Sequence, residues 1–533
     1  MKKQLWLPLA VLLSWGCYGS PFPDKPKLII YIVIDQLPGE LFQRIESEFT
    51  GGFKWLLDHG IEFRNTHHEH GYTVTGVGHF VLGSGRYPGP AGVLGNSWYS
   101  RELRKSIYCV EDSLAISIGG EGKGRSYRQT RATAVGDWMK KADSKSKVFT
   151  VAGKDRSAVL LGGKNPDLAI YYNYDGSFIS SDYYANQLPE WLVDFNQNLN
   201  FLTYRDSVWD HFAPPEFYQE FGTVDNFIGE YDLFDNDPYS PTLPISMKNK
   251  SPEEVNNTIA ATPWFDRIVL DLAERTINNE QLGEDHHTDL LCIGLSAADW
   301  IGHNNGPHSH EILDYYMRID KNLMKFIHQV DLEIGLENVM FVLSSDHGTM
   351  PLPEYLQEKG IDAGRLNTHV SRERIDNITH KTNNEIMYEA GGFYFPEEYS
   401  EKQKKAGLEI IETELKDMKG IERFITKKEI LNMDGLNSFE RRMKNMIHPE
   451  KSADVFILMK ENYCYKYPYG TSHGTPYDYD TYVPLVFSNI QMEPQKVERP
   501  IATVDIAPSI ASLLNIPIPN EVDGKTIFEI SNK

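Results

Sequence analysis

The stretch V-M-F-V-L-S-S-D-H-G-T-M at residues 339–350 indicates the fold, because a short apolar run passes directly into a polar turn. Val339–Leu343 is typical of a strand that is buried on both faces of a parallel sheet. The turn places Asp346 and His347 side by side at the carboxyl end of that strand, where open α/β sheets keep their ligand sites. A carboxylate oxygen and an imidazole nitrogen are ligands that Zn²⁺ accepts. Alone, the pair also fits a turn followed by a surface histidine, so other strand ends decide the interpretation.

The same pattern recurs at other apolar runs. Residues 28–34 form a β-branched run that we expect to be the central strand, and residues 289–295 form another buried strand. The candidate ligands at these strand ends and at one later return to the core are Asp35, Asp299, His303, Asp346, His347 and His473. Each alone could be a helix cap or a loop histidine. Three carboxylates and three imidazoles together predict two four-coordinate zinc sites.

Strand-like and helix-like segments alternate along the chain, which predicts an α/β fold with a central, mostly parallel sheet flanked by helices. Residues 41–59 and 310–330 have helical patterns. Two stretches interrupt the alternation, an aromatic-rich one near 167–250 and a polar, charge-rich one near 351–465. We expect both to be insertions in a single catalytic domain that spans residues 21–533.

Composition narrows the function. The 533 residues are 41% hydrophobic, which is enough for a full core. The chain has 53 Lys+Arg against 75 Asp+Glu, a formal net charge of −22. This balance argues against nucleic acid or an anionic membrane as the main partner. It would also repel a phosphorylated substrate, so a phosphate site would need local positive charge, for which bound metals are the obvious source.

The N-terminus has the pattern of a secretory signal peptide at residues 1–20. Lys2-Lys3 precede the apolar stretch Leu5–Trp15, and small residues follow. The apolar stretch is too short to span a bilayer in the mature protein. We therefore expect a periplasmic or extracellular protein.

The cysteines suggest little redox chemistry. Cys17 follows Gly16 and would fit a lipidated N-terminus, but the residue before that pair fits a lipoprotein signal poorly, so plain export is preferred. Membrane association would require a lipidated Cys17. Cys292 lies in an apolar run and is interpreted as a buried thiol. A disulfide between Cys109 and Cys464 is possible but cannot be deduced from spacing.

A set of short motifs occurs in a specific order between about Lys27 and Lys525. They are V-I-D-Q-L, T-G-V-G-H, G-K-D-R-S-A, A-A-D-W-I-G-H-N-N-G-P, S-S-D-H-G, G-T-S-H-G-T-P and V-D-I-A-P-S-I. In this order the sequence resembles the alkaline phosphatase superfamily, and within it the phosphate-irrepressible (PafA-type) bacterial alkaline phosphatases. Their neighbours are the nucleotide pyrophosphatase/phosphodiesterases.

The resemblance implies a role for each matching residue. It assigns one zinc to Asp35, Asp346 and His347, and a second zinc to Asp299, His303 and His473. It also assigns the nucleophile to Thr75 and the contact with a non-bridging phosphoryl oxygen to Asn96. Lys154 and Arg156 match the Lys-x-Arg pair of the family. Thr73 competes for the first of these roles, but Thr75 abuts the Gly-Val-Gly-His segment and would lie at a helix N-terminus, which favours an oxyanion.

The implied activity is that of a monomeric, secreted alkaline phosphatase with two zinc ions per chain. It would hydrolyse small phosphate monoesters through a phosphothreonine and release inorganic phosphate. Arg156 can bind two phosphoryl oxygens in a fork and Lys154 adds a point charge.

Several alternatives remain open from the sequence. A phosphodiesterase on the same fold has less use for Lys154 and Arg156, because a diester carries one fewer charge, yet the tyrosines and Trp191 between 171 and 191 leave room for a nucleotide-like leaving group. A sulfatase would need Cys or Ser where Thr75 stands, and a mutase fits poorly with export. A non-catalytic surface binding protein would be expected to have lost a metal ligand, and none is missing.

Overall fold

The computed structural model describes residues 25–231 and 242–530. The predicted signal peptide and Cys17 lie outside these residues. None of the helices in the described ranges has both the length and the hydropathy that crossing a bilayer requires.

The core is an 11-stranded sheet. In spatial order its strands are β23 (Gln495–Val497), β2 (Gly60–Phe63), β22 (Leu485–Ser488), β14 (Val339–Ser344), β1 (Leu28–Ile34), β13 (Asp289–Leu295), β8 (Val148–Ala152), β9 (Leu168–Tyr172), β10 (Phe178–Ser181), β6 (Glu111–Ile118) and β7 (Lys123–Arg125). The strands from β14 to β9 are parallel. Antiparallel pairs continue the sheet on both sides of them. The predicted α/β fold is confirmed, and the sheet is parallel at its centre rather than throughout.

Strand β1 lies between β13 and β14, as predicted for the central strand. Ile34 pairs with Leu295, and Val33 pairs with Ser344. The three strands therefore end at nearly the same level, and the residues that follow them share the carboxyl edge of the sheet.

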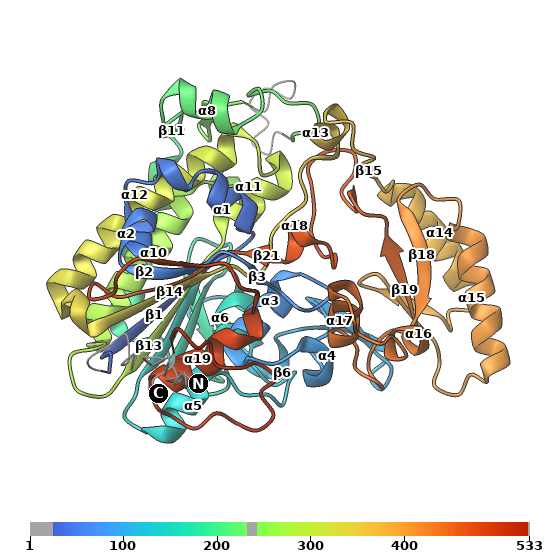
Figure 1. The fold of residues 1–533 in the computed structure, drawn as a ribbon, viewed down its shortest axis with the longest axis horizontal. Helices are drawn as coiled ribbons and strands as arrows, with labels where there is room; N and C mark the ends of the chain where they lie inside the picture. Colours follow the sequence, from blue (N-terminus) through green and yellow to red (C-terminus); the bar gives the residue numbers. More distant parts are fainter. Residues whose placement is uncertain (1–24, 232–241, 531–533) are drawn as a thin grey trace, which may run out of the picture.

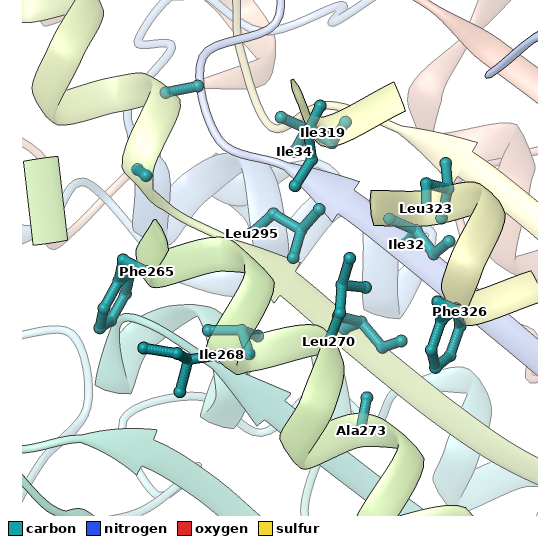
Figure 2. Close-up of a cluster of buried hydrophobic side chains, with 14 of the residues drawn as sticks. Ile32, Ile34, Phe265, Ile268, Leu270, Ala273, Leu295, Ile319, Leu323 and Phe326 are labelled. Atoms are coloured by element: carbon teal, nitrogen blue, oxygen red, sulfur yellow. The ribbon is translucent and has the colours of Figure 1, made fainter. Parts of the chain in front are cut away.

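Side chains of β1 alternate between two hydrophobic layers, as expected for a strand buried on both faces. One layer contains helices α10 (Pro263–Glu280) and α12 (His310–Ile334), and the other contains α5 (Val135–Ala142) and α19 (Ile506–Leu513). Figure 2 shows the first layer; its labelled side chains are Ile32, Ile34 and Leu295 from the strands, Phe265, Ile268, Leu270 and Ala273 from α10, and Ile319, Leu323 and Phe326 from α12. Burial of each large side chain contributes about 1.5–3 kcal/mol, so this packing fixes the strand ends that carry the site.

The aromatic-rich stretch near 167–250, which we expected to be an insertion, begins with two strands of the main sheet. Residues 168–172 and 178–181 form β9 and β10 of the main sheet. Tyr171 and Tyr172 are buried strand residues, which accords with the β propensity of tyrosine. Helices α7 (Glu190–Asn198) and α8 (Pro215–Phe221) follow the two strands; α7 contacts α10, and α8 contacts α12.

The stretch near 351–465 forms a lobe beside the main sheet, shown in orange in Figure 1. Its own four-stranded sheet has the order β16 (Met387–Glu389), β17 (Gly392–Tyr394), β19 (Val455–Met459) and β18 (Ile421–Thr426). Helices α14 (Thr368–Lys381) and α15 (Glu401–Leu415) accompany this sheet, and the lobe has a hydrophobic core of its own.

The predicted helix over 41–59 is wrong as a single element. The structure has α1 (Gly39–Arg44) and α2 (Gly52–Asp58) with a break between them. The carboxylate of Asp320, on α12, accepts the backbone N–H groups of Thr50, Gly51 and Phe53 at 3.0, 2.6 and 2.7 Å. A side chain from another helix thus caps the start of α2.

The possible disulfide between Cys109 and Cys464 is not formed. Cys109, Cys292 and Cys464 are all free and buried. Cys109 packs with helix α3 (Thr75–Ser84), whereas Cys464 lies in β20 (Tyr463–Cys464) and belongs to a different hydrophobic cluster. The prediction of a buried thiol at Cys292 is confirmed.

Candidate active site

All six predicted metal ligands meet at the carboxyl edge of the central strands. Ligand atoms of Asp35, Asp299 and His347 lie within 4.8 Å of one another, and so do those of Asp299, His303 and His473. Asp299 therefore lies within reach of both histidine sets. We call Asp35, Asp346 and His347 the first group, and Asp299, His303 and His473 the second group.

The first group is fully buried. His347 Nε2 lies 3.5 Å from Asp35 Oδ1 and 3.4 Å from Asp346 Oδ2. All three of these atoms are buried and lack a hydrogen-bond partner. Burial raises the pKa of Asp35 well above its ordinary value, with Asp346 adding to the effect and Lys154 opposing it. Buried oxygen and nitrogen atoms that lack a hydrogen-bond partner fit a cation bound among them.

The second group is centred on one carboxylate oxygen. Asp299 Oδ1 lies 3.3 Å from His303 Nε2 and 3.4 Å from His473 Nε2. Burial lowers the pKa of His303 to about 4, so its imidazole is neutral at pH 7. A neutral imidazole is the form that ligates metals.

The outer nitrogens of the three histidines are held by backbone carbonyls. Nδ1 lies 3.0 Å from Gly348 O in His347, 2.9 Å from Thr471 O in His303 and 2.7 Å from Thr73 O in His473. A nitrogen that faces a carbonyl carries the hydrogen, so the Nε2 lone pairs point into the site. The residues present therefore fit metal ions in both groups.

Lys154 bridges the two groups. Its Nζ lies 2.7 Å from Asp35 Oδ2 and 2.6 Å from Asp299 Oδ2, and 4.8 Å from the ring centroid of Trp300. Burial disfavours its charge, but the two carboxylates outweigh this and raise its pKa. Lys154 is therefore a permanent positive charge inside the site.

Thr75 is the first residue of α3, and His79 of the same helix lies beside the first group. His79 Nδ1 lies 2.9 Å from the Thr75 carbonyl oxygen and 3.2 Å from Asp346 Oδ2. The Thr75 Oγ1 lies 3.4 Å from Nη2 of Arg156. The Thr73 hydroxyl instead donates to the carbonyl of Thr475 at 2.9 Å. The helix approaches Asp346 very closely, since a Cβ on Gly78 would lie 2.1 Å from the Asp346 carbonyl oxygen. This contact explains the second glycine of T-G-V-G-H.

Asn96 and Arg156 flank the Thr75 hydroxyl. Asn96 Oδ1 accepts the Gly76 N–H at 2.7 Å, which leaves its amide nitrogen free for another acceptor. Arg156 Nη1 donates to the Tyr108 hydroxyl at 3.3 Å, and that hydroxyl donates to Asp155 at 2.6 Å. The guanidinium is thus positioned in part by Tyr108, a residue that the site motifs do not include.

A cavity of about 440 Å³ opens beside the second group. His303, His473 and Val74 line it, together with Tyr388 and Phe456 of the second insertion. The insertion for which the sequence offered no role therefore forms part of the site.

Sequence reasoning missed Gln36. Its Nε2 donates to Asp299 Oδ1 at 2.7 Å and its N–H donates to Asp346 Oδ1 at 3.1 Å. Its backbone has a φ of 64°, an unusual value for a residue other than glycine that is typical of functional sites. The motif V-I-D-Q-L contains Gln36, but no sequence pattern indicates this conformation.

Two adjacent Asp–His groups, a hydroxyl at a helix N-terminus and a Lys-x-Arg pair, gathered at the carboxyl edge of an α/β sheet, define a metal-assisted phosphoryl-transfer enzyme. The sequence model of the type I phosphodiesterase/nucleotide pyrophosphatase family matches residues 29–480. The chain belongs to this family, and within it to the PafA-like alkaline phosphatases.

The relatives that place it there align over their whole length. Alkaline phosphatase PafA of Elizabethkingia meningoseptica is 30% identical over 99% of both chains, and alkaline phosphatase PhoV of Synechococcus elongatus is also 30% identical over 99% of both. The crystal structure of wild-type PafA superposes with a TM-score of 0.88, at 30% identity, over 96% of this chain and 99% of PafA. A further PafA structure carries one threonine-to-serine substitution and substitutions of one asparagine, one lysine and one arginine by alanine.

Proposed function

We propose that this chain is a zinc-dependent phosphatase that hydrolyses phosphate monoesters through a phosphothreonine at Thr75. The observation that carries the proposal is the position of the Thr75 hydroxyl, at the N-terminus of α3 and 3.4 Å from the guanidinium of Arg156. His79 of the same helix lies 3.2 Å from Asp346 Oδ2 of the first Asp–His group. The relatives named alkaline phosphatase support the same chemistry.

The residues that would hold zinc are Asp35, Asp346 and His347 in the first site and Asp299, His303 and His473 in the second. Bound zinc would lower the pKa of a hydroxyl and withdraw charge from phosphoryl oxygens. The unpartnered buried atoms of the first group and the inward Nε2 lone pairs support this assignment.

In the first step the Thr75 oxygen would attack phosphorus and lose its proton. The bond between phosphorus and the ester oxygen would break. The ester oxygen would take up a proton and leave as the alcohol, and the phosphoryl group would remain on Thr75. In the second step a water oxygen would attack phosphorus, the bond to Thr75 would break, and phosphate and the free hydroxyl would result. The helix N-terminus favours negative charge at this oxygen in both steps.

Three side chains would contact the equatorial phosphoryl oxygens. The free amide nitrogen of Asn96 and the fork of Arg156 are both next to Thr75. Lys154 adds a buried positive charge. A PafA variant replaces a threonine, an asparagine, a lysine and an arginine together, and the same four residue types meet here. Hydrogen-bond donors and positive charge placed at all three equatorial oxygens stabilise the transition state of phosphoryl transfer most.

The charges favour a monoester over a diester. A monoester dianion places its charge on oxygens that Lys154 and Arg156 can neutralise, whereas a diester carries one fewer charge. The family description includes phosphodiesterases, so diester hydrolysis is the second candidate.

The test compares an aryl phosphate monoester with the corresponding bis-aryl diester, with zinc supplied. We expect the wild type to prefer the monoester. Thr75→Ala should lower kcat/KM by at least about 10³-fold. Lys154→Ala/Arg156→Ala should lower monoester turnover far more than diester turnover.

Thr73→Ala is the matched control, because the Thr73 hydroxyl is bonded to a backbone carbonyl, and it should retain most activity. A diester preference that is indifferent to Lys154 and Arg156 would support the second candidate. Loss in Thr73→Ala with full activity in Thr75→Ala would exclude Thr75 as nucleophile.

We further propose that the chain is exported and acts as a monomer on small phosphate esters. Export rests on the pattern of residues 1–20. The size of the N-terminally processed protein, measured by mass spectrometry of the secreted chain, tests cleavage and any lipid on Cys17.

A further inference from the structure

A second set of ligand atoms converges in the region of α8, at the top of Figure 1 and separate from the residues of the catalytic groups. His211 follows β11 (Val208–Trp209), Asp225 lies in the loop after α8, and His310 is the first residue of α12. His211 Nε2 lies 3.0 Å from His310 Nδ1, which lies 3.3 Å from Asp225 Oδ1. We call these residues the His211–Asp225–His310 cluster.

The tautomer of each imidazole in the cluster is set by the group that its outer nitrogen faces. His310 Nε2 lies 3.0 Å from the carbonyl oxygen of Thr223, so this nitrogen carries the hydrogen and Nδ1 has a free lone pair. His211 Nδ1 faces the carboxylate of Asp210 at 3.4 Å, which favours the hydrogen there and a lone pair on Nε2. This is the carboxylate–histidine arrangement of metal sites.

The third ligand atom has no partner of its own. Asp225 Oδ1 is buried and makes no hydrogen bond. It faces the lone pair of His310 Nδ1, so two acceptors oppose each other across 3.3 Å. A single cation at the point where the three lone pairs meet would satisfy all of them.

The cluster is held rigid from behind. Asp314, one turn after His310, accepts the Trp209 indole N–H at 2.7 Å, the Phe212 N–H at 2.6 Å and the Tyr218 hydroxyl at 2.6 Å. These contacts fix the chain on both sides of His211. Ligands positioned before the ion arrives lower the cost of binding it.

We propose that His211, Asp225 and His310 bind a divalent metal ion of the Zn²⁺ type, additional to the catalytic metals. Two imidazole nitrogens and one carboxylate oxygen are a donor set that Zn²⁺, Co²⁺ and Ni²⁺ accept. Neighbouring ligands of a tetrahedral zinc are roughly 3.3 Å apart, close to the separations found here. His211 is partly exposed, which leaves room for a water as fourth ligand.

The ion would join the α8 region to the start of α12. Helix α11 (Ala297–Asn305), which carries Asp299 and His303, immediately precedes α12 in the chain. We assign the ion a structural role, because none of its three ligands belongs to the catalytic groups. The proposal does not rest on the proposed phosphatase activity.

The experiment measures bound metal in the full chain after dialysis against Zn²⁺, by elemental analysis. We expect the double variant His211→Gln/His310→Gln to bind one equivalent fewer than the wild type and to keep its turnover of an aryl phosphate. Asp225→Asn, which keeps the side-chain shape, should weaken the same equivalent. An Asp299→Ala/His473→Ala background, which removes the second catalytic group, should still show the difference.

A Co²⁺-loaded wild type should also show an absorption component that the double variant lacks. Equal metal content and equal Co²⁺ spectra in the wild type and the double variant would overturn the proposal. In that case a plain His–His hydrogen bond would account for the 3.0 Å contact. If the double variant does not fold, the comparison of Asp225→Asn with the wild type decides.

Discussion

Arg156 is the side chain whose position depends most on residues outside the motifs. The Tyr108 hydroxyl links it to Asp155, and Arg125 holds the other oxygen of Asp155 at 2.7 Å. A guanidinium that must meet two phosphoryl oxygens in a fork loses much of its value when it is free to turn.

Removing the Tyr108 hydroxyl should therefore loosen Arg156. We expect Tyr108→Phe to lower kcat/KM for an aryl monoester about tenfold, and to change diester turnover much less, because one hydrogen bond to a charged group is worth about 1.5–3 kcal/mol. Tyr171→Phe is the control, since the buried Tyr171 hydroxyl has no hydrogen-bond partner. Equal effects of both changes would contradict the positioning role.

At the scale of single residues, the sequence predicted which Asp and His side chains gather, because these residue types follow apolar strand-like runs. Their role as metal ligands stays a prediction. The sequence did not predict Gln36, Tyr108 or Trp300. Their roles come from a left-handed backbone at Gln36 and from contacts between segments far apart in the chain. No local spacing encodes such contacts.

Among the elements, α11 presents Asp299 and His303, and its start is fixed by Asp266 of α10. The Asp266 carboxylate accepts the N–H groups of Ser296 and Ala297, both at 2.8 Å, and the Tyr315 hydroxyl at 2.7 Å. Burial raises its pKa to about 6, so it is ionised at pH 7.

Asp266→Asn would turn an N–H₂ group toward one of these donors. We expect a loss of about 2 kcal/mol in the free energy of unfolding, together with a lower kcat/KM, because α11 would shift. Urea denaturation and steady-state kinetics at pH 7.5 measure the two effects. Asp271→Asn, on the exposed side of the same helix, should change neither. A fully stable and active Asp266→Asn protein would contradict this account.

The second insertion contributes part of the lining of the cavity beside His303 and His473. Tyr388 there should contact an aromatic leaving group. We expect Tyr388→Ala to raise KM about fivefold for an aryl phosphate, in line with about 1 kcal/mol of lost aromatic contact. Glycerol phosphate serves as control substrate in the same variant and should be unaffected. An equal rise for both substrates would indicate damage to the fold instead.

Helices and strands were predicted correctly where the apolar pattern in the sequence was uninterrupted, as in β1, β13, β14 and α12. Errors arose where a distant residue ends an element. Asp320 caps α2 and splits the helical pattern of residues 41–59. The stretch near 167 was interpreted as an insertion because it is rich in aromatic residues, yet two of its tyrosines lie in β9.

For the molecule as a whole, buried acids oppose stability at high pH. Burial raises the pKa of Glu311 to about 8, with Asp225 adding to it, and burial together with Glu311 raises that of Glu230 to about 11. Folded Glu311 keeps its proton up to about pH 8, whereas the unfolded chain releases it near 4.5. The folded state binds more protons in that window, so the free energy of unfolding falls as pH rises through it.

Glutamine at this position stays neutral at every pH. We expect Glu311→Gln to reduce the fall in Tm between pH 5 and pH 8.5, measured by thermal denaturation at several pH values. Both proteins are first treated with a chelator, so that no cation is bound at the His211–Asp225–His310 cluster. Glu333→Gln, exposed on the same helix, is the control and should leave the profile unchanged. A profile for Glu311→Gln that matches the wild type would show that Glu311 is ionised throughout.

The overall architecture was predictable because alternating strands and helices leave few arrangements. The cavity was not, since it arises where an insertion without a recognisable motif meets the core.

Asp35 lies near one end of the chain and His473 near the other, although both belong to one site. A ribosome delivers Asp35, Asp299 and His347 well before His473. The second group of ligands is complete only after residue 473 has been synthesised. Under the proposed mechanism, a chain terminated before residue 473 would lack one ligand of this group and should release no phosphate.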